Sequence, residues 1–298
     1  MRTTFPIQYI EPVFRPPSEA HSLILPVTNG CSWNQCTFCE MYTAPQKKFR
    51  PRTLAEIEID LQNVAQQGLP VRRIFLADGD AMALSTRRLL AILQAIKQFL
   101  PHIERVSTYC LPRNVANKSV AELQELREAG LQMVYVGCES GDDEVLQRVN
   151  KGETFQSSKE SLLKLGQAGM TRSVMILNGL GGSSLSMQHA INSAKLMNET
   201  QPEYLSTLVV SFPMGTERFK QHFPDFELPD TVGLMQELAM MIAQLNLNQT
   251  VFRSDHASNY LVLKGVLGQD KEALLAKIHS AITHPEQANL RSEWMRGL

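Results

Sequence analysis

Three cysteines within nine residues are the most chemically distinctive feature of the sequence. Cys31, Cys36 and Cys39 lie in a polar loop that follows the apolar residues 23–27 and begins at Gly30. Thiolates this close together can converge on a single metal ion or cluster. The loop is therefore predicted to be a metal or iron–sulfur site just beyond the end of a buried strand.

The number of thiolates bears on which metal is held. A structural zinc site is closed by four ligands, whereas three thiolates on a [4Fe–4S] cube leave one iron open to a ligand that is not protein. The other two cysteines, Cys110 and Cys138, form no second cluster. Two alternatives remain: an iron–sulfur electron carrier, and a zinc-stabilised binding protein that takes one of these two cysteines as its fourth ligand.

The loop resembles the cluster loop of the radical S-adenosylmethionine (radical SAM) superfamily, including the aromatic Phe38 before the last cysteine. The spacing Cx4CxxC differs from the usual three and two intervening residues, and the broad likeness is to the Elongator-like and oxygen-independent coproporphyrinogen oxidase groups. The resemblance implies a [4Fe–4S] cluster on Cys31, Cys36 and Cys39 whose open iron chelates SAM. It further implies reductive cleavage of SAM and abstraction of hydrogen from an unidentified substrate by the resulting 5′-deoxyadenosyl radical.

The elements that must position this loop alternate between apolar strands and amphipathic helices. Six strands are predicted at residues 23–27, 73–77, 105–109, 133–136, 173–177 and 205–210, and two intervening helices begin with the capping boxes Thr53-x-x-Glu56 and Ser119-x-x-Glu122. This alternation predicts an α/β protein with a parallel sheet. The pattern fits an open sheet or a partial barrel, and the resemblance implies a partial (β/α)6 TIM-like barrel.

The barrel is expected to occupy residues 23–216. Residues 1–22 are rich in proline and are predicted to be an N-terminal extension lying over it. Residues 217–298, which include a helix from about Val232 and the strand-like residues 261–263, are predicted to form a helical C-terminal segment that covers the open side of the barrel.

Functional groups of parallel α/β folds lie at the carboxyl ends of the strands. The resemblance implies that the residues after the second strand bind the amino end of SAM, although they could instead cap the next helix. It also implies that an acidic residue after the fourth strand binds the ribose hydroxyls. A glycine cluster after the fifth strand would let the backbone approach the ligand. The predicted SAM-binding residues are Asp78, Gly79, Asp80, Glu139, Ser140, Asn178, Gly179 and Gly181.

The substrate side is predicted from the polar run 252–260. Arg253 and His256 in this run are expected to contact the substrate if the run lies against the open side of the barrel; the alternative is an ordinary surface loop. Cys110 and Cys138 fall at predicted strand ends, where a buried structural role is favoured over a radical or covalent one.

Composition limits the possible partners. The chain of 298 residues carries 29 Lys and Arg against 30 Asp and Glu, so no overall basic charge indicates a nucleic-acid partner. No apolar run is long enough to span a membrane, and five cysteines suit a reducing compartment, so a cytoplasmic protein is expected. The expected partners are a small-molecule or other unidentified substrate and a reductase or flavodoxin-type electron donor. The basic run 46–52 is interpreted as a solvated loop or, alternatively, as a contact for an anionic substrate or that donor.

Overall fold

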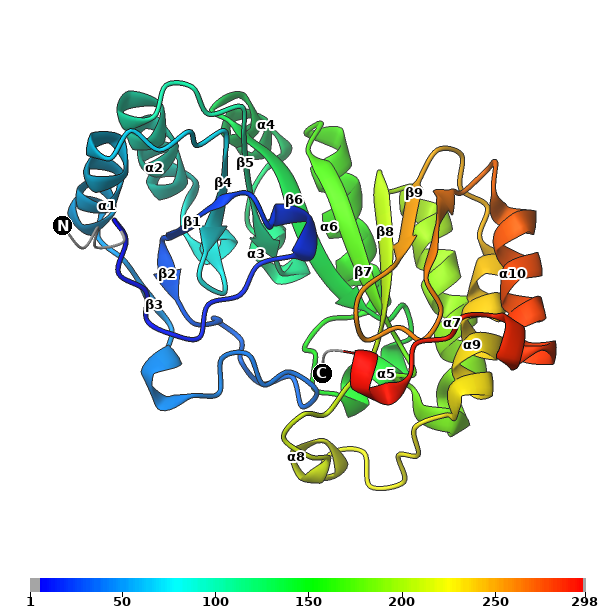
Figure 1. The fold of residues 1–298 in the computed structure, drawn as a ribbon. Coiled ribbons are helices and arrows are strands. Elements are labelled where there is room, and N and C mark those ends of the chain that lie inside the picture. Colours follow the sequence, from blue (N-terminus) through cyan, green and yellow to red (C-terminus); the bar gives the residue numbers. More distant parts are fainter. Residues whose placement is uncertain (1–5, 297–298) are drawn as a thin grey trace. The chain divides into compact units, whose positions relative to one another are not determined.

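The computed structural model describes residues 6–296, and the chain divides into two compact units whose strands and helices are labelled in Figure 1. The first unit holds the residues up to Asn34, 39–136 and 164–171; the second holds Gln35–Phe38, Gly137–Leu163 and the chain from Arg172 onward. The cysteine loop therefore contributes Cys31 and Cys39 to the first unit and Cys36 to the second.

The first unit is built on four parallel strands. Their order is β1 (Leu23–Pro26), β4 (Arg73–Ala77), β5 (Arg105–Cys110) and β6 (Leu131–Glu139), and the last three residues of β6 belong to the second unit. Three helices pack in succession: α1 (Leu54–Gln66) on α2 (Thr86–Phe99), and α2 on α4 (Val120–Glu128). Both predicted capping boxes are present, at the starts of α1 and α4. The shorter elements are β2 (Thr28–Asn29), β3 (Arg50–Pro51), α3 (Pro112–Ala116) and the 3-10 turns η1 (Pro17–Glu19), η2 (Pro45–Lys47) and η3 (Ala81–Ala83).

The second unit continues the alternation. Strands β7 (Thr171–Asn178), β8 (Tyr204–Val209) and β9 (Val251–Ser254) run parallel, and β10 (Leu263–Val266) pairs antiparallel with β9. Helix α9 (Thr231–Gln244) packs against both α7 (Gly182–Thr200) and α10 (Lys271–Thr283), and the three lie together on one side of β8 and β9 (Figure 1). The remaining elements are α5 (Asp143–Arg148), α6 (Phe155–Gln167), whose last four residues belong to the first unit, α8 (Glu217–Lys220), η4 (Pro285–Gln287) and η5 (Glu293–Met295).

All six predicted strands are present, as is the helix predicted from about Val232. The C-terminal segment adds the strands β9 and β10 to the expected helices. Strand β9 was not predicted, and β10 begins at Leu263, the last of the strand-like residues 261–263. Strand β9 overlaps the start of the run 252–260, which was expected to be a polar loop. In this strand Phe252 and Ser254 are buried, whereas Arg253 between them is exposed. A four-residue strand with so few apolar residues has too weak an alternation of apolar and polar side chains to be distinguished from a loop in the sequence.

The N-terminal extension packs against the strands of the first unit, from Pro6 onward; residues 1–5 of this predicted segment lie outside the described residues. The Tyr9 hydroxyl donates to the carbonyl of Ile24 in β1 at 2.9 Å. Further along, buried Glu19 accepts a 2.7 Å bond from Tyr135 in β6 and pairs with Arg105 in β5 at 2.7 Å. These contacts attach the described part of the N-terminal segment to β1, β5 and β6.

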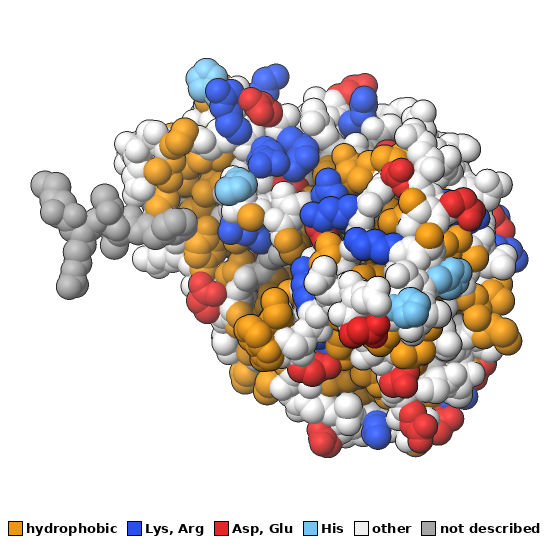
Figure 2. All heavy atoms as spheres, turned by 45° about the vertical axis from the view of Figure 1, so that its right-hand side comes forward, with side chains coloured by type: hydrophobic (Ala, Val, Ile, Leu, Met, Phe, Trp, Pro, Cys, Tyr) orange, Lys and Arg blue, Asp and Glu red, His pale blue; other side chains and the backbone are white. Residues whose placement is uncertain are grey.

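The surface carries mixed charge. On the face shown in Figure 2, Lys and Arg side chains are interspersed with acidic and hydrophobic ones. Across the described residues, no helix combines the length and the apolar character that crossing a membrane requires.

Candidate active site

Two glycines bring the start of the cysteine loop against the end of strand β4. Gly79 has φ 92°, and a Cβ at this position would lie 2.3 Å from the carbonyl oxygen of Gly30. Gly30 has φ 74°, and a Cβ there would lie 1.9 Å from the carbonyl oxygen of Lys47. Because no side chain fits these contacts, both glycines are required for the loop to lie against the residues that follow β4.

Asp78 is held by a buried lysine. Its side chain is 3% exposed and forms an ion pair with Lys47, which is fully buried and also donates to the carbonyl of Ile10. Burial raises the pKa of Asp78, and the Lys47 charge opposes that rise. In the basic run 46–52, Lys47 is therefore an internal counterion, whereas Lys48 and Arg50 are exposed as a solvated loop would require.

Tyr42 shares this buried region of the first unit. Burial and the nearby Asp78 carboxylate raise the pKa of its phenol. The Tyr42 side chain in turn opposes the rise in the pKa of Asp78. Tyr42, Asp78 and Lys47 therefore form one buried polar cluster at the end of β4.

Asp80 fastens the cysteine loop itself. Its carboxylate accepts hydrogen bonds from the hydroxyl of Ser32, which follows Cys31, and from the amide of Asn114 at 3.4 Å. Burial raises the pKa of Asp80, and the bond from Ser32 opposes that rise. Asp80 Oδ1 has no partner in the part of the chain that the structure describes. Asp80 immediately precedes the 3-10 turn η3, and the backbone of Ala83 in this turn also opposes the rise in its pKa. For Asp78 and Asp80, capping and SAM binding both stay predictions.

Of the three cysteines in the loop, Cys31 and Cys39 are partly exposed and Cys36 is buried. Among residues 6–296, no group of three or more His, Cys, Asp or Glu side chains is arranged to hold a metal ion. The metal assignment therefore depends on the cysteine spacing and on the relatives described below. Cys138 is fully buried, and burial raises the pKa of its thiol to about 12. A thiol that stays protonated near neutral pH fits the structural role that was favoured for it.

The second unit places Glu139 at the end of β6. This residue is 6% exposed and adopts φ 66°, a left-handed conformation that costs energy for a residue other than glycine. Glu139 Oε1 lies 3.2 Å from Nζ of buried Lys151, while Oε2 has no hydrogen-bond partner among the described residues. A buried carboxylate with one spare oxygen at a strand end is suited to accept hydrogen bonds from ligand hydroxyls.

Lys151 is charged in spite of its burial. Burial lowers the pKa of Lys151, but the neighbouring Glu139 and Cys36 raise it and prevail, so the pKa lies above its ordinary value. Neither Lys47 nor Lys151 was predicted from the sequence to be a buried countercharge. A buried acidic side chain needs a countercharge, and this was the signal available in the sequence. It does not identify which lysine supplies the positive charge.

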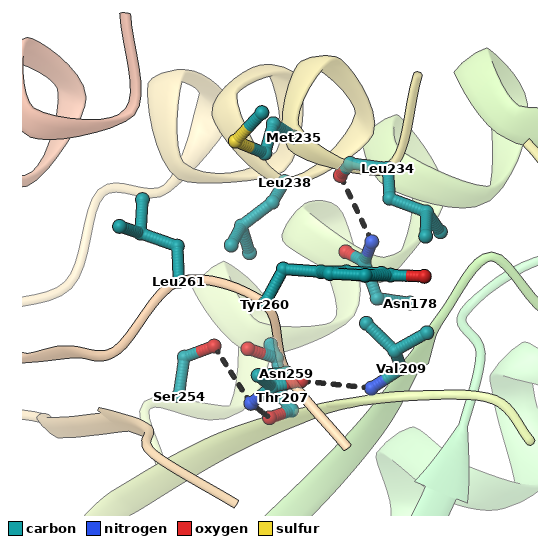
Figure 3. A pocket seen from close by; sticks show the side chains of 10 residues that line it. All are labelled: Asn178, Thr207, Val209, Leu234, Met235, Leu238, Ser254, Asn259, Tyr260 and Leu261. Carbon is teal, nitrogen blue, oxygen red and sulfur yellow. Dashed lines mark hydrogen bonds between the residues drawn. The ribbon is translucent and has the colours of Figure 1, made fainter. Parts of the chain in front are cut away.

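The other predicted SAM-binding groups are already engaged. The hydroxyl of Ser140 and Nδ1 of His189 lie 2.8 Å apart. Asn178 donates to the carbonyl of Leu234 in α9 at 2.9 Å, as Figure 3 shows, and the Gly179 amide donates to Glu237 at 2.6 Å. A Cβ at Gly181 would touch Leu185 of α7 at 3.2 Å. These contacts account for the residues structurally, and their contact with SAM stays a prediction.

Figure 3 shows a small cavity between strand β8 and helix α9 of this unit. It has a volume of about 20 Å³, which is room for about one water. Thr207 lines it, and its hydroxyl has no partner in the described chain. A single bound water would satisfy that hydroxyl, and the cavity is too small for a substrate.

Arg253 and His256 lie in different surroundings. His256 follows the carboxyl end of β9, where Nδ1 lies 2.9 Å from the Ser258 hydroxyl and Arg291 donates to the carbonyl of His256. Burial and the Arg291 charge lower the pKa of His256, which favours the neutral imidazole. Arg253 is exposed within β9, with its guanidinium 5.3 Å from the centre of the Tyr204 ring. Their role toward a substrate stays a prediction.

Comparison with known proteins identifies a family whose model matches the chain. The family model of the "Radical SAM superfamily" matches residues 25–194, a span that begins in β1 and ends within α7. The heme chaperone HemW of Bacillus subtilis (strain 168) is 25% identical over 154 residues, which cover 50% of this chain and 40% of HemW.

Solved structures show the same fold. The match to the coproporphyrinogen III oxidase HemN from Escherichia coli, a radical SAM enzyme, covers 75% of this chain and 52% of the HemN chain, with a TM-score of 0.56 and 17% identity. The match to methylornithine synthase (PylB) covers 76% of this chain and 63% of the PylB chain, with a TM-score of 0.51 and 19% identity. The α/β fold thus resembles the partial TIM barrel of these enzymes. The chain spans less than two thirds of HemW, HemN or PylB.

Proposed function

Because the chain belongs to the radical SAM superfamily and is an enzyme of that kind, we propose that Cys31, Cys36 and Cys39 hold a [4Fe–4S] cluster used to cleave SAM. When bound, such a cluster supplies an electron to SAM, and the adenosyl radical that results abstracts hydrogen from a substrate. The observation that carries the proposal is the docking of the cysteine loop on the end of β4, through Gly30, Gly79 and the bond from Ser32 to Asp80. Three thiolates leave one iron coordination position for SAM.

The carboxyl ends of the strands offer fitting partners for SAM. Glu139 Oε2, buried and without a partner in the described chain, is proposed to accept hydrogen bonds from the ribose hydroxyls. The backbone of Asp78, Gly79 and Asp80 is proposed to bind the amino end, with Asp80 Oδ1 available as an acceptor. Asp78 contributes little net charge, because Lys47 neutralises it. The remaining residues of the proposed SAM set are Ser140, Asn178, Gly179 and Gly181.

The substrate side is proposed from the residues at and after β9. His256 lies at the carboxyl end of that strand, the edge at which parallel α/β enzymes place their functional groups. Arg253 is exposed and cationic, so an acidic group is the chemistry it would bind. We propose both as substrate contacts. The electron donor is proposed to be of the flavodoxin type, and the protein is proposed to work in the cytoplasm, where its thiols stay reduced.

The proposal is tested by anaerobic purification with iron and sulfide analysis and an absorption spectrum. Wild-type protein is expected to carry about four iron and four sulfide ions, as a single cube requires. Replacement of Cys31, Cys36 or Cys39 by alanine should abolish the cluster, while replacement of Cys110 should not. A full cluster in the Cys36→Ala protein would refute the ligand assignment, and zinc in place of iron would refute the function.

A further inference from the structure

Lys151 places a buried positive charge beside the cysteine loop, within the second unit. Its side chain is 3% exposed, and Nζ lies 3.2 Å from Glu139 Oε1 and 5.8 Å from the centre of the Phe38 ring. In sequence Phe38 lies between Cys36 and Cys39. The ammonium therefore lies between the proposed ribose-binding carboxylate and the loop that carries the proposed cluster ligands.

The turn that carries this lysine is bonded to the backbone on both sides of Cys36. The amide of Thr37 donates to the carbonyl of Val149 at 3.0 Å, and the Thr37 hydroxyl donates to the same oxygen at 3.3 Å. The side-chain amide of Asn150 donates to the carbonyl of Gln35 at 3.3 Å. Because Gln35 and Thr37 flank Cys36, these bonds hold the backbone of Cys36 close to the turn.

The backbone of the turn directs the lysine inward. Asn150 and Gly152, on either side of it, have φ 50° and 71°, and the amide of Lys151 donates to the carbonyl of Leu146 at 2.9 Å. Burying an ammonium is costly unless it is paired. Glu139, whose Oε1 lies 3.2 Å from Nζ, is a carboxylate that pairs with it.

We propose that the Lys151 ammonium makes the bound cluster easier to reduce, while the turn that carries it holds the Cys36 segment in place through Val149 and Asn150. The inference rests on the proposed function, since it requires a cluster on Cys36. The step concerned is the transfer of one electron from an external reductant to the oxidised cluster, with no bond formed or broken. A fixed positive charge next to a thiolate ligand stabilises the added electron, whereas the negative charge of Glu139 opposes it.

The test is a redox titration of the reconstituted protein without SAM, followed by electron paramagnetic resonance of the reduced cluster. Lys151→Met should lower the equilibrium constant for reduction at least about tenfold, which is a shift of about 59 mV to more negative potential for a one-electron couple. Lys151→Arg should restore most of the potential because it keeps the charge. Glu139→Gln should shift the potential in the opposite direction, because it removes a negative charge.

The matched control is Lys159→Met, which removes a lysine of the same unit that is 31% exposed and paired with Glu199 at 2.7 Å; its potential should equal that of the wild type. An unchanged potential in Lys151→Met with full iron content would overturn the proposal, even if SAM binding fell. If Lys151→Met does not fold, Glu139→Gln decides: a shift to more positive potential supports the proposal and no shift overturns it. Failure of the wild-type protein to take up any cluster would instead refute the proposed function.

Discussion

The ion pair between Lys47 and Asp78 gives a quantitative prediction about how the cysteine loop is held. The pair is almost free of solvent, since the Lys47 and Asp78 side chains are 0% and 3% exposed. Lys47→Met removes the cation and leaves the carboxylate buried without its partner. Removing one member of a buried pair typically costs about 3–5 kcal/mol in the free energy of unfolding. We expect a loss of this size in Lys47→Met at neutral pH.

The loss should depend on pH with a defined sign. Burial already raises the pKa of Asp78 above its unfolded value, and removal of the Lys47 charge should raise it further. A carboxyl with a raised folded pKa is favourable to the folded state while it is protonated, and this advantage is lost as the pH rises through the folded pKa. The destabilisation of Lys47→Met should therefore be smallest in acid and grow toward neutral pH.

The assay is urea unfolding of the wild type and variants at pH 5 and pH 7.5. Lys48→Met is the matched control, because the neighbouring Lys48 is exposed, and it should change the free energy of unfolding by less than about 0.5 kcal/mol. The double variant Lys47→Met/Asp78→Asn should recover much of the loss, because no unpaired charge remains. Equal stabilities of Lys47→Met and Lys48→Met at pH 7.5 would refute the reasoning.

Three further predictions concern the site. Gly79→Ala should reduce both the free energy of unfolding and the iron content, because its methyl group would clash with the cysteine loop; iron analysis and urea unfolding check this, and a fully loaded, stable variant would contradict it. Glu139→Gln should weaken SAM binding by about 1.5–3 kcal/mol, the worth of a charge-assisted hydrogen bond, with the cluster retained; calorimetry with SAM measures it, and unchanged affinity would return the residue to a structural role. Cys138→Ala, His256→Ala and Arg253→Ala should leave iron content and SAM affinity unchanged, and a loss of iron in any of them would show that the cluster has been assigned too few ligands.

Local patterns predicted most of the fold. The apolar strands, the capping boxes that begin α1 and α4, and the helix α9 each have a signal within a few residues. Strand β9 has no such signal, because it is short and its exposed Arg253 interrupts the apolar pattern. It becomes a strand by pairing with β8, a contact distant in sequence.

The site was predictable only in part, for the same reason. The cysteines, Asp78 and Glu139 could be proposed as site residues because strand ends and ligand spacing are visible in sequence. Their partners Lys47 and Lys151 could not, since the choice of countercharge for a buried acid depends on tertiary contacts. The glycine cluster after β7 shows the opposite problem. Glycines let the backbone approach a ligand, but they also allow close packing within the protein, as Gly179 packs against Leu234.

The central claim is that this protein cleaves SAM reductively on a cluster held by Cys31, Cys36 and Cys39. The most direct measurement is anaerobic incubation of the reconstituted protein with SAM and dithionite, with 5′-deoxyadenosine and methionine quantified by mass spectrometry. Both products are expected to form in the wild type, and neither is expected to exceed background in Cys36→Ala. A protein with a complete, dithionite-reducible cluster that forms no 5′-deoxyadenosine, or equal product from Cys36→Ala, would contradict it.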